Sequence, residues 1–125
     1  MSLLRIHALV AIAFAVAVVI QIFLAGAAIA ALGGSGNFAT HIEFGYTAIG
    51  IAALVLVVTA FVARLPRREI GYVLLVLIVY IIQTILPNLR SSVSFLAALH
   101  TVNAAVLFAL AAWYARRTWQ AAMAG

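Results

Sequence analysis

Four long apolar runs divide this 125-residue chain and constrain its fold more than any other feature. Their approximate bounds are 6–32, 38–63, 69–86 and 93–116. Each run is long enough to cross the hydrocarbon core of a bilayer, which takes about 17–25 apolar residues. Because 69% of the residues are apolar and only 7% are charged, the chain has too little polar surface for a water-soluble domain. We therefore predict an all-α integral membrane protein with four transmembrane helices.

Short polar segments connect the runs, so we expect an up-down four-helix bundle that forms a single domain over residues 1–125. The arginines at one end of this bundle are Arg5, Arg64, Arg67, Arg68, Arg116 and Arg117, and Arg90 falls at the other end. The positive-inside rule then predicts that both termini are cytoplasmic. The composition, rich in Ala, Val and Arg, is typical of a bacterial protein, which indicates the inner membrane. The arginines form no single basic face, so the expected partner is the lipid bilayer and not nucleic acid.

Two histidines, His41 and His100, lie inside the second and fourth apolar runs. An ionisable group at such a depth is costly unless it has a partner, so both positions are candidates for a functional site. Counted from the outer side, His41 lies about four residues into its helix and His100 about seven, a difference in depth of ~5 Å. We expect the two side chains to face each other across the bundle.

A weak internal repeat supports this arrangement. Gln21 closes the first helix and precedes His41 by 20 residues, while Gln83 closes the third helix and precedes His100 by 17 residues. Two hairpins that enter the membrane in the same orientation are related by an axis along the membrane normal. With Asn103, these residues predict a polar layer in the outer half of the bundle, whereas the inner half reads as almost purely apolar.

Small residues share a helical face with each histidine. They are Gly45 and Ala48 in the second run, and Ala97 and Ala104 in the fourth. Such residues let membrane helices pack closely, and beside two histidines they also predict a slot for a flat macrocycle. Because histidines on facing helices are recurrent ligands of haem iron, we predict one haem b per chain, held by His41 and His100. Arg90 is either a partner of the haem propionates or a solvated loop charge.

Other chemistries have fewer candidate residues. The chain has no cysteine, and two histidines with Glu43 fall short of the four ligands that zinc prefers. No catalytic triad, phosphate loop or dinucleotide motif is recognisable, so the sequence leaves enzymatic activity open. His7 lies at the inner end, where no second histidine is available, and is expected at the membrane interface or against a partner.

The string Leu99-His100-Thr-Val-Asn103-Ala-Ala-Val-Leu-Phe resembles the ligand-bearing helix of the haem A synthase superfamily. Each half of such an enzyme is a four-helix bundle with a histidine on its second and fourth helices, so the resemblance implies that His41 and His100 bind haem. Those enzymes carry a catalytic glutamate one turn before the second-helix histidine and an arginine after it. Here position 38 is Phe and Ile42 follows His41, so the resemblance does not extend to haem oxidation. The order of these motifs along the chain also resembles a family of small uncharacterised bacterial membrane proteins.

The predicted function is therefore electron transfer by a bis-histidine haem protein, as a small subunit of a respiratory or photosynthetic complex. Two alternatives stay open. One is a cofactor-free structural or assembly subunit, in which Gln21, Gln83 or Asn103 hydrogen-bonds the histidines. The other is a binding protein for a quinone or a similar lipophilic molecule. The expected protein partner is a larger membrane complex or a second copy of the chain.

Overall fold

The computed structural model describes residues 2–89, 91 and 93–124, without the side chains of Ser94 and Ala97. The described residues contain no β-strand, which confirms the all-α fold class. The α-helices are α1 (Leu3–Ala28), α2 (Ala39–Tyr46), α3 (Ala48–Val62), α4 (Arg67–Ile85) and α5 (Ser94–Ala124). Two short 3₁₀ turns, η1 (Ala30–Leu32) and η2 (Leu86–Leu89), follow α1 and α4.

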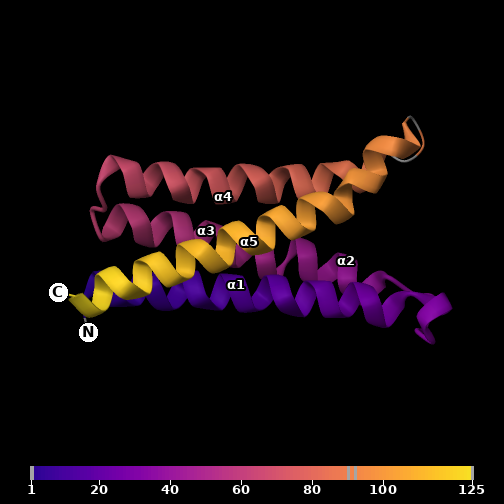
Figure 1. Ribbon diagram of the computed structural model, residues 1–125, viewed down its shortest axis with the longest axis horizontal. Coiled ribbons are helices and arrows are strands. Elements are labelled where there is room, and N and C mark those ends of the chain that lie inside the picture. Colours follow the sequence, from indigo (N-terminus) through magenta and orange to yellow (C-terminus); the bar gives the residue numbers. More distant parts are fainter. Residues whose placement is uncertain (1, 90, 92, 125) are drawn as a thin grey trace.

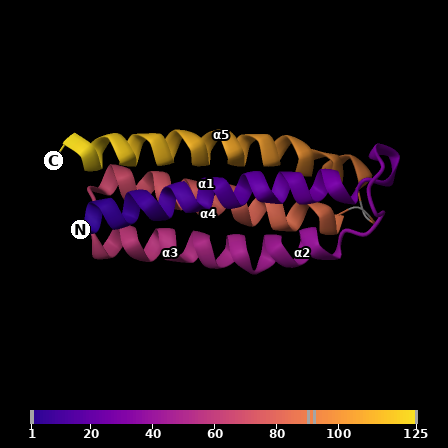
Figure 2. The same ribbon diagram turned by 90° about the horizontal axis from the view of Figure 1, so that it is seen from below.

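The helices run up and down as one bundle, in which α2 and α3 together form a single pass (Figure 1). Both chain termini and the turn between α3 and α4 lie at one end, here called the termini end. The turns η1 and η2 lie at the other end, here called the far end (Figures 1 and 2). Within the bundle α1 packs against both α3 and α5, and α4 packs against α3 and α5.

The surface of the bundle fits lipid and not water. Four described helical segments are long and apolar enough to cross a membrane: Leu3–Ala28, Ala39–Val62, Arg67–Leu89 and Ala98–Ala124. Large apolar side chains cover the outside, among them Phe23, 70% exposed, and Ile51, 63% exposed. In water this exposed apolar area would drive association, whereas in a bilayer it meets hydrocarbon. The chain is therefore a multi-pass membrane protein.

The core is built largely from small and β-branched residues, which allow the helix backbones to approach closely. On α1 the buried residues Ala8, Ala11, Phe14 and Val18 follow one another at intervals of three or four and so form one face. The central cluster of buried residues comprises Ala11, Phe14, Val18, Ile49, Ala53, Leu56, Ala60, Val73, Val76, Val79, Leu107, Ala111, Tyr114 and Ala115. At the termini end the Arg117 guanidinium donates hydrogen bonds to the Glu69 carboxylate, with a shortest N–O distance of 2.6 Å, and joins α5 to α4.

In the half of the bundle toward the far end, the structure differs from two of the predicted helices. The first run was predicted to be helical over 6–32, but α1 ends at Ala28, and the chain turns through Gly33, whose φ of 83° suits glycine. The second run, predicted over 38–63, is interrupted at Thr47. The Thr47 hydroxyl donates a 2.6 Å hydrogen bond to the carbonyl of Glu43 one turn earlier, a contact that bends helices.

The other two predicted helices differ mainly in length. The third, predicted over 69–86, begins at Arg67 directly after Pro66, because proline fits the start of a helix. The fourth, predicted over 93–116, continues to Ala124. Past the two arginines of this helix the chain still buries one face, with Thr118 and Ala122 four residues apart, so α5 stays packed beyond the apolar run.

Candidate functional site

His41 pairs with Gln21 across α1 and α2. The His41 Nδ1 lies 3.1 Å from the backbone carbonyl oxygen of Gln21, which can only accept a hydrogen bond, so Nδ1 carries the hydrogen. The His41 Nε2 is therefore the atom with a free lone pair. The Gln21 side-chain amide donates to the His41 carbonyl at 2.9 Å and lies 3.4 Å from His41 Nε2.

His100 pairs with Gln83 across α4 and α5 in the same way. The His100 Nδ1 lies 3.0 Å from the Gln83 carbonyl oxygen, and the Gln83 amide nitrogen lies 3.2 Å from His100 Nε2. Asn103 adds a further contact, because its amide donates to Gln83 Oε1 at 2.7 Å and to the Val79 carbonyl at 3.0 Å. The repeat predicted from the Gln–His spacing is therefore present as two Gln–His pairs that share the contact from Nδ1 to the glutamine carbonyl. The side-chain amides differ, since Gln21 donates to the His41 carbonyl and Gln83 accepts from Asn103.

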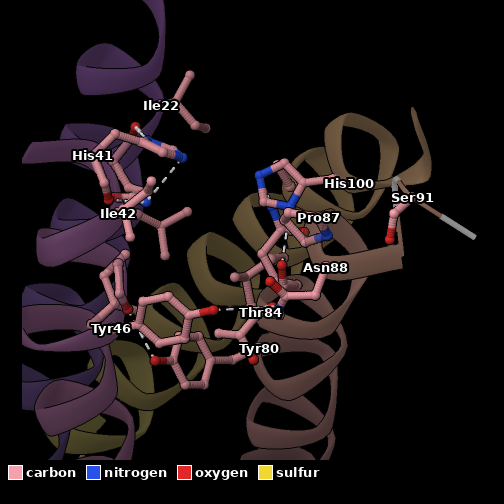
Figure 3. A pocket seen from close by; sticks show the side chains of 17 residues that line it. Ile22, His41, Ile42, Tyr46, Tyr80, Thr84, Pro87, Asn88, Ser91 and His100 are labelled. Atoms are coloured by element: carbon pink, nitrogen blue, oxygen red, sulfur yellow. Dashed lines mark hydrogen bonds between the residues drawn. The ribbon is translucent and has the colours of Figure 1, made fainter. Parts of the chain in front are cut away.

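The two histidines face each other near the far end. Their ring centroids are 6.3 Å apart and their planes are nearly perpendicular, at 83°. They lie on opposite sides of a pocket of about 510 Å³, to which every pass of the bundle contributes (Figure 3). This size is typical of small-molecule and cofactor sites, which span roughly 300–1,000 Å³. The predicted juxtaposition of His41 and His100 is confirmed.

The other predicted site residues separate into three groups. Gln21, Gly45, Gln83 and Ala104 line the pocket with the histidines. Ala48 and Asn103 are not among its lining residues, although Asn103 holds Gln83. Arg90 and the side chain of Ala97 lie outside the described residues, so their predicted roles stay predictions.

Gly45 lines the pocket and also makes room for a neighbouring side chain. A Cβ atom at this position would come within 2.6 Å of Gln21 Nε2. The missing side chain therefore gives the Gln21 amide room to reach the backbone of α2.

Tyr46 and Tyr80 form one wall of the pocket, a role that sequence reasoning missed. The Tyr80 hydroxyl, on α4, donates to the Gly45 carbonyl at 2.9 Å, and the Tyr46 hydroxyl, on α2, donates to the Thr84 carbonyl at 3.3 Å. Figure 3 shows both rings on the same side of the pocket, away from the imidazoles. The only signal in the sequence was spacing, because Tyr80 precedes Gln83 by three residues and so shares its helical face.

His7 does not lie at the interface, and that prediction is wrong. The side chain is fully buried near the termini end, with Nδ1 2.9 Å from Thr59 Oγ1 and Nε2 2.9 Å from the Tyr114 hydroxyl. The inner half of the bundle is therefore not purely apolar. Thr59 and Tyr114 lie 52 and 107 residues from His7, so no local spacing indicated the contact.

The donor set limits which metals suit the pocket. Among the described residues no group of three or more His, Cys, Asp or Glu side chains comes together. Glu43 is exposed and contributes nothing to the pocket lining. Two imidazoles alone suit a metal that brings its remaining ligands with it, as an iron in a macrocycle does.

Comparison with known proteins shows the family of this chain. The model of DUF6220, a family of unknown function, matches residues 21–89, and the chain belongs to this family. The matched segment begins at Gln21 and includes His41 and Gln83. No curated protein and no solved structure matches the chain.

Proposed function

We propose that this member of the DUF6220 family is a membrane protein that holds one haem b between His41 and His100. The observation that carries the proposal is the facing pair of imidazoles, each with its Nδ1 hydrogen bonded to a backbone carbonyl. That bond fixes the tautomer and leaves Nε2 as the ligating atom, an arrangement common among histidines that bind metals.

The separation of the two rings supports a shared metal. With a metal–nitrogen bond of about 2 Å and roughly 1 Å more to each ring centre, two imidazoles on one metal have centres about 6 Å apart. The 6.3 Å between the centroids of His41 and His100 is close to this value. To hold a metal, both Nε2 atoms would have to turn toward it, and the amides of Gln21 and Gln83 would have to give up their contacts with them.

A haem held by His41 and His100 would supply a one-electron iron couple suited to electron transfer. The protein orients the two rings through backbone carbonyls of two different helices. Apolar side chains, among them those of Ile22, Ile42 and Ile49, also line the pocket. In this proposal the chain serves as an electron-transfer subunit of a larger respiratory or photosynthetic membrane complex.

The proposal includes an orientation in the bacterial inner membrane, with both termini in the cytoplasm. The described arginines Arg5, Arg64, Arg67, Arg68, Arg116 and Arg117 belong to segments that lie at the termini end. An excess of arginine marks the cytoplasmic side of a membrane protein. The haem pocket then lies in the half of the bundle that faces away from the cytoplasm.

Absorption spectroscopy tests the haem site. Wild-type protein produced with a supply of haem is expected to show the Soret and α bands of a low-spin haem, which sharpen on reduction with dithionite. His41→Ala and His100→Ala should each abolish this low-spin spectrum, because each removes one axial ligand. His7→Gln is the matched control, since His7 lies at the opposite end and should leave the bands in place. A colourless wild-type protein would contradict the proposal.

A second candidate is a cofactor-free structural or assembly subunit. It is favoured by the contacts of Gln21 and Gln83, whose amides already approach both Nε2 atoms. In this case His41→Ala and His100→Ala lower stability without changing any visible spectrum, and the wild type co-purifies with a larger complex.

A third candidate, a site for a quinone or a similar lipophilic molecule, is favoured by the size of the pocket and by its position within the membrane-spanning segments. Binding of a quinone analogue to colourless protein, lost in Gln83→Leu, would distinguish it from the structural candidate.

A further inference from the structure

A second pocket, of about 420 Å³, lies at the termini end, apart from the pocket between the histidines. Segments of α1, α4 and α5 and the turn between α3 and α4 form its walls, and these segments meet at one end of the bundle (Figures 1 and 2). Its lining includes the apolar residues Leu4, Leu65, Pro66 and Ala121 and the polar residues Glu69, Arg117 and Gln120. The pocket therefore offers an apolar surface beside polar groups, as an amphipathic ligand requires.

The guanidinium of Arg117 is held in place but keeps an edge that its ion pair does not use. Its Nε and Nη2 donate to the Glu69 carboxylate, so Nη1 is not engaged by that pair. The rings of Tyr72 and Trp113 have their centroids 5.4 Å and 5.8 Å from the guanidinium carbon, which is within the range of cation–π contacts. The Arg117 side chain is still 37% exposed. A guanidinium fixed in this way loses little freedom when Nη1 donates to a further acceptor.

The charge around this pocket favours an anion. The chain has only two acidic residues, and one of them, Glu43, lies in α2 toward the far end. The other, Glu69, is already paired with an arginine of the pocket. Arg5 follows one lining residue in the sequence, and Arg64 and Arg67 flank two more. Positive charge is therefore in excess here, and basic pockets between membrane helices are recurrent sites for anionic lipid headgroups.

We propose that this pocket binds the headgroup of an anionic phospholipid of the phosphatidylglycerol class. The phosphate oxygens accept hydrogen bonds from Arg117 Nη1 and from the amide of Gln120, which is exposed. The glycerol backbone and the first carbons of the acyl chains lie against the apolar part of the lining, which a free phosphate ion would leave unfilled. This site is independent of the haem proposed at the other end of the bundle.

Thermal unfolding of the full-length protein in an uncharged detergent tests the lipid class. Phosphatidylglycerol should raise the unfolding midpoint as its concentration increases, because it binds the folded state only. Phosphatidylcholine should raise it less, since its choline group brings a positive charge next to the arginines. Inorganic phosphate at the same ionic strength should leave the midpoint unchanged, because it lacks the apolar part of the ligand.

Titration of phosphatidylglycerol into variants, followed by native mass spectrometry, tests the residues. Arg117→Lys should weaken binding about tenfold, as expected for the loss of one hydrogen bond to a charged group. The lysine keeps the charge and the pairing with Glu69, but its single ammonium presents no second edge. Gln120→Ala should also weaken binding, and its exposed position leaves the fold intact. Arg116→Gln is the matched control, because it removes a whole charge from a neighbouring residue outside the lining and should bind almost as the wild type does.

Three results would overturn the inference. Equal shifts of the unfolding midpoint with phosphatidylglycerol and phosphatidylcholine would show that the pocket does not select an anionic lipid. A shift of the same size with inorganic phosphate would show that a free anion suffices. Equal weakening in Arg116→Gln and Arg117→Lys would show diffuse attraction to the arginines and not binding in the pocket. None of these results bears on the haem site, which absorption spectroscopy tests separately.

Discussion

The buried histidine near the termini end shows how a single polar residue is accommodated in a membrane bundle. The Thr59 hydroxyl donates its hydrogen to the Leu56 carbonyl at 3.1 Å, so it accepts from His7 Nδ1. His7 Nε2 then accepts from the Tyr114 hydroxyl. Each polar atom of the imidazole has a partner, and the three side chains join α1, α3 and α5. His7 can therefore pack in the interior of the bundle, because both of its ring nitrogens have a hydrogen-bond partner.

Removing the Tyr114 hydroxyl should therefore destabilise the bundle. Tyr114→Phe leaves His7 Nε2 without a donor, at an expected cost of about 0.6 kcal/mol, the average for interhelical hydrogen bonds in membranes, and at most about 1.7 kcal/mol. The measurement is the free energy of unfolding in mixed detergent micelles. Tyr46→Phe is the matched control, because Tyr46 is exposed and its 3.3 Å bond is longer, so the loss should be smaller. Equal losses in the two variants would contradict this account.

At the scale of the elements, the contact between α1 and α2 depends on the absence of a side chain at one position. The Gln21 amide reaches the His41 carbonyl because Gly45 has no Cβ in its path. A glycine inside a helix costs roughly 0.5–1 kcal/mol relative to alanine. One net hydrogen bond contributes about 0.5–1.5 kcal/mol, so the contact offsets the cost of the glycine.

A pair of glycine substitutions tests this balance. Gly71→Ala should stabilise the protein by about 0.5–1 kcal/mol, since an added Cβ meets nothing within 4 Å and the helix propensity improves. Gly45→Ala should give no such gain in the wild type, because it displaces Gln21. In a Gln21→Ala background the gain should return. Stability measured across this double-mutant cycle checks the coupling, and additive effects would argue against it.

At the scale of the whole molecule, the two ends of the bundle differ in their charged and polar groups. The described arginine side chains and the Glu69–Arg117 ion pair belong to segments at the termini end, while the two Gln–His pairs lie near the far end. This asymmetry underlies the proposed orientation. The pocket between the histidines therefore lies toward the end of the bundle that is opposite to these arginines.

Cysteine labelling can determine the orientation directly, because the chain has no natural cysteine. In intact cells whose outer membrane is permeable, a membrane-impermeant maleimide should label Ser35→Cys and should not label Gln120→Cys. Both variants should react once the inner membrane is dissolved. Labelling of Gln120→Cys alone in intact cells would reverse the proposed topology.

The sequence predicted the features that depend on composition and on spacing along the chain. The lengths of the apolar runs indicated four membrane-spanning passes. The similar intervals from Gln21 to His41 and from Gln83 to His100 indicated the two Gln–His pairs. The partners of His7 could not be predicted, because depth in the membrane does not say which way a side chain faces. The interruption at Thr47 was missed for a related reason, since it depends on one side-chain hydrogen bond and not on hydropathy.

The length of α5 has a further consequence for the bilayer around the protein. At ~1.5 Å per residue its 31 residues span about 46 Å, well beyond a hydrocarbon core of about 30 Å. Figure 1 shows this helix crossing the bundle obliquely, and its last turns carry Arg116 and the exposed Trp119, residues suited to the headgroup region. Helices of this kind respond to hydrophobic mismatch by changing their tilt. Since α5 also carries His100, we expect a change in the tilt of α5 to alter the spacing between His100 and His41.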